Sequence, residues 1–169
     1  MTAATLPPIE GKTTVNVPVE QAFQVFTASF GSWWPHAYHI GQAEVADVIL
    51  ESHEGGRWYE RGVDGTECDW GRVLAWEAPH RIVFTWQING SWQFDPDPAH
   101  ASEIEIHFHA DGPPQTTVAV EHRHFERLVD GQNIYGAIHG GGGWPALLDS
   151  YARRVNEQPS TEQQGTDQA

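Results

Sequence analysis

Regularly spaced turn signals between Glu44 and His124 constrain the fold of this chain most strongly. Glycine, aspartate and proline residues at these turns separate short segments in which apolar and polar residues alternate. Such alternation predicts strands with one buried face, and glycine supplies the positive φ that tight turns need. The predicted strands are 44–51, 57–61, 69–76, 81–86, 102–109 and 116–124. We therefore expect a six-stranded antiparallel meander.

Two further segments frame this meander. Residues 13–17 alternate like an additional strand, and residues 18–26 change to helical spacing, with a proline where a first helical turn tolerates one. After the meander, Gly140 to Gly143 is typical of a flexible hinge or a helix entry. Residues 144–156 then place apolar side chains three and four positions apart. This spacing predicts a helix whose apolar face packs against the sheet.

Length and composition agree with a single domain of 169 residues. We expect residues 1–10 to be a flexible N-terminus, residues 11–157 to form the domain, and residues 158–169, rich in polar side chains, to be a disordered tail. No stretch approaches the roughly 18 apolar residues of a membrane span, and the N-terminus lacks a signal-peptide pattern. The expected location is cytoplasmic.

The charge balance excludes several classes of partner. Acidic side chains number 23 against 9 basic ones, so the formal net charge is −14. Nucleic acids and anionic membranes are bound by lysine and arginine side chains that neutralise phosphates, so neither is an expected partner. Nucleotide-binding loops and a serine-hydrolase elbow are absent from the sequence, and no cofactor is expected.

The histidines and the single cysteine do not predict a metal site. His36 and His39 are three positions apart, but zinc usually takes three protein ligands and no third is evident. Strand parity points His107 outward and His122 inward, which separates them. Cys68 is the only cysteine, so an internal disulfide and a thiolate cluster are both excluded. We therefore expect no bound metal.

Four short motifs occur in the same order as in a known superfamily. They are EGGRW at 54–58, GRV at 71–73, PHRIVFTW at 79–86 and GWPALL at 143–148. With these motifs the chain resembles the START-like, or SRPBCC, superfamily over residues 11–156, and within it the bacterial homologues of the activator of the heat-shock-protein-ninety ATPase. The resemblance implies an α+β helix-grip fold, in which a seven-stranded antiparallel sheet curls around a long C-terminal helix. It also implies two short helices after the first strand and a cavity for apolar molecules.

Strand parity indicates which side chains face such a cavity. Ile104, Ile106 and Phe108 share one face, and His122 and His124 follow the inward alternation of the next strand. Together with aromatic residues of the other segments, this yields ten candidate lining residues. They are Trp33, Trp34, Trp58, Glu60, Phe84, Trp86, Phe108, His122, Trp144 and Leu148. For the large aromatics, core packing is the competing interpretation.

Three functions remain open at this point. The leading hypothesis is binding of a small, largely apolar molecule without catalysis, because such sites need apolar walls and few polar groups. The alternative is a cyclase or hydrolase of the same superfamily, with His122 or Glu60 handling a proton. A third hypothesis is a module that interacts with a chaperone, like the ATPase activators.

His122 could be a hydrogen-bonded structural residue, a polar contact for the ligand or a base. A monomer and a homodimer are equally compatible with the sequence.

Overall fold

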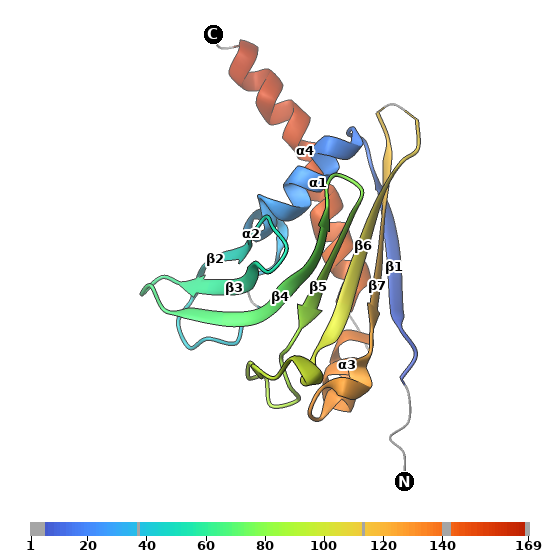
Figure 1. Ribbon diagram of the computed structural model, residues 1–169. Helices are drawn as coiled ribbons and strands as arrows, with labels where there is room; N and C mark the ends of the chain where they lie inside the picture. The colour runs from blue at the N-terminus through green and yellow to red at the C-terminus, as the bar shows by residue number, and fades with distance from the viewer. Residues whose placement is uncertain (1–5, 37, 113, 140–142, 168–169) are drawn as a thin grey trace.

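The computed structural model describes residues 6–36, 38–112, 114–139 and 143–167, with only the backbone described for 158–167. Its centre is an antiparallel sheet of seven strands in the order β1-β7-β6-β5-β4-β3-β2. The sheet curls around one long helix (Figure 1). The strands are β1 (Ile9–Val15), β2 (Val45–Leu50), β3 (Arg57–Gly62), β4 (Glu67–Glu77), β5 (Arg81–Trp86), β6 (Ser102–Ala110) and β7 (Thr116–Arg123).

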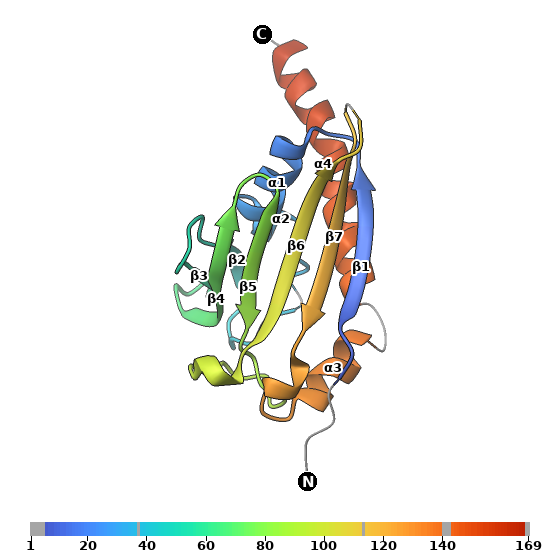
Figure 2. The same cartoon turned by 45° about the vertical axis from the view of Figure 1, so that its right-hand side comes forward.

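The helices cover the concave side and the ends of the sheet. Two short helices follow the first strand, as expected, and the C-terminal helix lies behind β7 and β1 (Figure 2). The helices are α1 (Val19–Thr27), α2 (Phe30–Trp33), α3 (Gly131–His139) and α4 (Gly143–Asp167), with the 3-10 turns η1 (Pro98–His100) and η2 (Phe125–Arg127). The α+β helix-grip fold is thereby confirmed.

The register of β6 and β7 confirms the predicted inward face. Ile104 pairs with His122, and Phe108 pairs with Val118, and all four side chains are buried. The intervening residues point outward, as Glu105 does. Burial raises the pKa of the Glu105 carboxyl, but hydrogen bonds from Arg81 and Arg123 outweigh this effect and lower the pKa to about 2. Alternation within each strand thus separates an apolar core from a charged outer surface.

Helix α4 packs closely on β1 because the strand carries a glycine there. A Cβ atom added at Gly11 would lie 3.2 Å from Cδ1 of Leu148, closer than most packed side chains approach. Leu148 is buried in the core. The helix extends to Asp167, so 158–167 of the predicted tail overlap its end, whereas 168–169 lie outside the described residues. The predicted domain boundary at residue 157 stays a prediction.

Apart from the longer α4 and shifts of one or two residues at the ends of other elements, the observed elements differ from the predicted ones in three places. Strand β1 begins at Ile9 rather than residue 13, because Ile9 already pairs with His122 of β7. His124 does not continue the inward alternation: it follows the end of β7 with a left-handed φ of 68°, and Nδ1 lies 3.4 Å from Oε2 of Glu126. The reversal at this residue ends the strand parity on which the prediction depended.

Helix α3 is the third difference, since no helix was predicted between the meander and the glycine run. Its buried Ile134 and Ile138 are four positions apart, a helical signal too short to stand out beside the neighbouring glycines. Of the predicted hinge, Gly143 starts α4, and 140–142 lie outside the described residues. Together α3 and the start of α4 form one side of the pocket described next.

Candidate ligand-binding pocket

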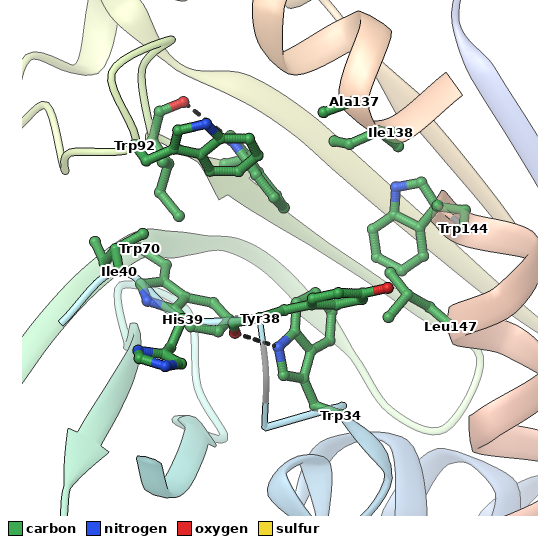
Figure 3. A pocket seen from close by; sticks show the side chains of 13 residues that line it. Trp34, Tyr38, His39, Ile40, Trp70, Trp92, Ala137, Ile138, Trp144 and Leu147 are labelled. Atoms are coloured by element: carbon green, nitrogen blue, oxygen red, sulfur yellow. Dashed lines mark hydrogen bonds between the residues drawn. The ribbon is translucent and has the colours of Figure 1, made fainter. Parts of the chain in front are cut away.

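A pocket of about 290 Å³ opens at the end of the sheet that faces α3 and the first turns of α4. Its walls come from the segment after α2, from β4, from β5 and the loop after it, and from α3 and α4 (Figure 3). Aromatic and aliphatic side chains form most of the lining. The lining residues are Trp34, Tyr38, His39, Ile40, Trp70, Trp86, Ile88, Trp92, Ala137, Ile138, Gly143, Trp144 and Leu147.

Three of the ten residues proposed from the sequence lie in this lining: Trp34, Trp86 and Trp144. Trp58 and Phe84 form a layer behind the wall. The Trp58 ring contacts Phe84 at a centroid distance of 4.8 Å, and it lies 6.0 Å from Trp34 and 6.1 Å from Trp86. Both residues are fully buried, so they support the pocket wall without lining it.

Three others lie farther from the pocket. Trp33 and Phe108 both pack against Phe26 in α1, at centroid distances of 4.9 Å and 5.6 Å. Leu148 lies against β1 at Gly11, as described above. All three belong to the core between sheet and helices. The candidate list therefore combined pocket and core residues, which share the same inward face.

His122 is fully buried and hydrogen-bonded on both sides of its ring. The indole N–H of Trp144 donates to Nδ1 over 3.1 Å, and Nε2 lies 2.9 Å from Oγ of Ser102. The Ser102 hydroxyl in turn donates to the carbonyl oxygen of Trp86 over 3.0 Å. An Nδ1 atom that accepts leaves the ring hydrogen on Nε2, where it donates to Ser102. Burial lowers the pKa of His122 to about 3, so the ring is neutral.

Glu60 is buried with 1 % of its surface exposed, and its carboxylate organises the segment before β2. Oε1 accepts from the backbone N–H of Ile40 over 2.6 Å and from the indole N–H of Trp70 over 2.9 Å. Oε2 accepts from the N–H of Gly41 over 3.1 Å. These hydrogen bonds hold two pocket-lining residues, Ile40 and Trp70, in place. Glu60 itself does not line the pocket.

The mouth of the pocket is formed by loop residues that strand and helix periodicity did not select. Tyr38 and Trp92 are 49 % and 46 % exposed. Trp92 has a φ of 60°, and the Asn89 side chain accepts from two backbone N–H groups of its turn. In the view of Figure 3, Trp92 and Trp34 lie on opposite sides of the pocket. The sequence feature that could have indicated Tyr38 and Trp92 is the frequency of aromatic residues in the loops.

His39 also lines the pocket, and one contact indicates the tautomer of its neutral ring. Nδ1 lies 2.8 Å from the carbonyl oxygen of Gly41. Because a carbonyl only accepts, Nδ1 carries the hydrogen and Nε2 keeps the lone pair. The ring of His36 lies elsewhere, with Nε2 2.9 Å from the carbonyl oxygen of Gly31. Within the described part of the chain, no three histidine, cysteine or carboxylate side chains gather as metal ligands would.

Comparison with known families agrees with this architecture. Residues 16–156 match the family described as "Activator of Hsp90 ATPase homolog 1-like protein". The chain belongs to this family. The match confirms the resemblance stated from the four motifs, and it begins directly after β1 and spans the other six strands, β2 to β7. No curated protein matches the sequence.

Several solved structures share the fold. An anthrahydroquino-γ-pyrone synthase has 37 % sequence identity and a TM-score of 0.64, covering 88 % of this chain and 97 % of its own. The self-sacrificing resistance protein CalC from Micromonospora echinospora has 30 % identity and a TM-score of 0.66, covering 90 % and 96 %. For a protein from Nitrosomonas europaea, with 16 % identity and a TM-score of 0.62, the match covers 90 % of this chain and 96 % of the other; this similarity concerns the fold alone.

Among the described helices, none is long and apolar enough to cross a membrane.

Proposed function

We propose that this protein binds a small, largely apolar aromatic molecule in the pocket between the curled sheet, α3 and α4. The observation that carries the proposal is the composition of the wall. Five of its residues are tryptophans: Trp34, Trp70, Trp86, Trp92 and Trp144. Indole rings offer large apolar faces that stack on or pack edge to face against other aromatic rings. A flat aromatic ligand fits this chemistry best.

Two further observations support an uncharged aromatic ligand. The net charge of −14 disfavours an anionic molecule, which the electrostatic field of the protein would repel. The solved structure with 37 % identity is an anthrahydroquino-γ-pyrone synthase, whose name refers to a product with fused rings. This similarity supports a polycyclic aromatic ligand for this protein as well.

Filling the pocket tests the proposal. Titration with 2-naphthol should quench the tryptophan fluorescence saturably and raise the melting temperature, because a ligand that binds only the folded state stabilises it. Leu147→Phe adds bulk to the pocket wall and should weaken binding about tenfold or more, since a ring of the ligand loses its space. Leu74→Phe, on an exposed position of β4, is the matched control and should bind as the wild type does.

The opposite results would exclude this function. Equal affinities of the Leu147→Phe and Leu74→Phe variants for 2-naphthol would show that this molecule binds elsewhere. Lack of saturable binding by any member of a broad aromatic panel would reject the ligand hypothesis. Interaction with a chaperone ATPase, the role for which the family is named, would then be the function to test by co-purification with a chaperone.

Catalysis of a proton transfer is the second candidate, and His39 is the residue that favours it. Its Nδ1 donates to the carbonyl oxygen of Gly41, so in the neutral ring Nε2 keeps a lone pair that can accept a proton. The carboxylate oxygen Oε2 of Glu60 lies 3.8 Å from the same Nδ1. His122 and Glu60, the two bases considered from the sequence, are both occupied by hydrogen bonds. The related anthrahydroquino-γ-pyrone synthase is, by its name, an enzyme.

A chromogenic phenol distinguishes this candidate from simple binding. Alizarin bound to the wild type should show its phenolate absorption at a lower pH than free alizarin does, because a nearby base takes the proton. His39→Gln should abolish this displacement, whereas His36→Gln, on an exposed residue outside the pocket, should keep it. An identical displacement in both variants would exclude His39 as the base.

A further inference from the structure

The deep wall of the pocket has almost no hydrogen-bonding capacity left for a ligand. Four indole N–H groups of the lining already donate to acceptors of the protein. These pairs are Trp34 to the Tyr38 carbonyl at 3.0 Å, Trp70 to Glu60 at 2.9 Å, Trp86 to the Ile88 carbonyl at 3.0 Å, and Trp144 to His122 at 3.1 Å. The tryptophans therefore present apolar ring surface to the pocket while their donors are directed elsewhere.

The remaining buried lining side chains are aliphatic. Ile88, Ile138 and Leu147 are buried and carry no polar side-chain atom. The polar side chains of the lining belong to Tyr38, which is exposed, and to the partly exposed His39, whose Nε2 has no hydrogen-bond partner in the described part of the chain. Among the described residues, the Trp92 indole N–H, also at the mouth, has no hydrogen-bond partner. Polarity thus changes along the pocket, from an apolar inner end to a polar mouth.

We infer that the pocket selects aromatic ligands whose polar groups all lie at one end, and that these ligands enter with the unsubstituted ring first. This inference rests on the proposed binding function and names the ligand class. A hydroxyl carried to the inner end would lose its water and find the indole donors already engaged. A hydroxyl at the mouth keeps water and reaches the polar atoms there. The difference in environment between the two ends produces the selectivity.

Two isomeric diols test this selectivity without changing the composition of the probe. In 2,3-dihydroxynaphthalene both hydroxyls are at one end, whereas 2,6-dihydroxynaphthalene has one at each end. Isothermal titration calorimetry at neutral pH should give similar dissociation constants for 2-naphthol and the 2,3-diol. The 2,6-diol should bind roughly tenfold more weakly, the effect of one buried unpaired hydroxyl. Equal affinities of the two diols would overturn the inference, whereas failure of all three probes would reject the binding function itself.

A matched pair of variants locates the inner end. Ile88→Thr adds one hydroxyl at a buried lining position, and Ile88→Val has nearly the same shape without it. The threonine variant should reduce the difference between the two diols, because the inner hydroxyl gains a partner, and the valine variant should leave that difference unchanged. If the ratio of the dissociation constants of the 2,6-diol and the 2,3-diol were the same in both folded variants, the inner end would not lie at Ile88. This result would contradict the assigned orientation.

The mouth is tested by removing the tyrosine hydroxyl. Tyr38→Phe should weaken binding of 2-naphthol and of the 2,3-diol by about three- to tenfold, the range of one hydrogen bond, and should leave naphthalene unaffected. Tyr135→Phe, in α3 and outside the pocket lining, is the control for loss of a tyrosine hydroxyl. An equal loss of naphthalene and naphthol binding in Tyr38→Phe would mean that this residue contributes packing alone and would contradict the polar mouth.

Discussion

Nε1 of Trp144 lies 3.1 Å from Nδ1 of His122, so the first turn of helix α4 is tied by a hydrogen bond to the inner face of strand β7. The same histidine reaches Ser102 of β6, and through it the carbonyl of Trp86 at the end of β5. Trp86 and Trp144 both line the pocket. A neutral, buried histidine therefore sets the relative position of two pocket walls.

Replacement of His122 should lower stability. His122→Phe keeps an aromatic ring but leaves the Trp144 N–H without an acceptor, at a cost of about 1–3 kcal/mol in the free energy of unfolding. Denaturant unfolding measures this loss. His107→Phe, on the exposed face of the neighbouring strand, should change stability much less. Equal stability of the His122→Phe variant and the wild type would contradict the role of this histidine as a structural hydrogen-bonding residue.

Acid should destabilise the wild type more than a variant without this histidine. The pKa of His122 is lowered from 6.5 to about 3, so between these two values the unfolded chain binds a proton at this residue and the folded chain does not. The free energy of unfolding therefore decreases as the pH is lowered from 6.5 towards 3, by up to about 1.4 kcal/mol per pH unit. His122→Asn lacks this contribution. Unfolding is measured above pH 4.5, the ordinary pKa of the Glu105 carboxyl, so that the titration of this group contributes little. If the stability of the wild type and of His122→Asn changed with pH in the same way, the prediction would be refuted.

Glu60 should be sensitive to a change that preserves its shape. Glu60→Gln places an NH₂ group opposite one of the three N–H donors around the carboxylate, those of Ile40, Gly41 and Trp70. Two donors then face each other, and we expect a loss of about 1–3 kcal/mol together with weaker ligand binding. Glu67→Gln, at a partly exposed ion pair with Arg57, should cost under about 1 kcal/mol. Similar losses in both variants would argue against a special role of Glu60.

A charge on the buried face of α4 should unfold the protein. Leu148→Asp places an unpaired carboxylate at a side chain that is 1 % exposed and costs several kcal/mol, against a typical total stability of about 5–15 kcal/mol. Ala146→Asp introduces the same charge on the exposed side of the helix and should retain the fold. Circular dichroism during heating separates the two outcomes. A Leu148→Asp variant that melts with the wild type would refute the packing of α4.

Chelator treatment should change neither the melting temperature nor the ligand affinity. His36 and His39, the closest pair of histidines in the sequence outside the strands, contact the carbonyls of Gly31 and Gly41 rather than a shared position. Zinc usually needs three protein ligands. Elemental analysis of protein purified without a histidine tag is the direct measurement. One zinc or iron ion per chain would contradict this expectation.

The sequence by itself determined the succession of strands along the chain and their inward faces, because both depend on a period of two residues within a segment. Ile104 and Phe108 are buried as predicted, and Glu105 between them points outward. The amphipathic pattern of α4 likewise placed Leu148 in the core. Where local geometry departed from this periodicity, as at His124 with its positive φ, the prediction was wrong.

Only the tertiary structure decided which inward aromatics line the pocket. Trp58 and Trp86 both face inward, yet the irregular pairing of β3 with β4 beside Trp58 and the curl of the sheet put Trp58 in a layer behind Trp86. Tyr38 and Trp92 come from loops more than fifty positions apart, and only packing brings them to one mouth. Periodicity specifies the face of an element on which a side chain lies. It does not specify what lies opposite that face, because that depends on contacts between distant segments.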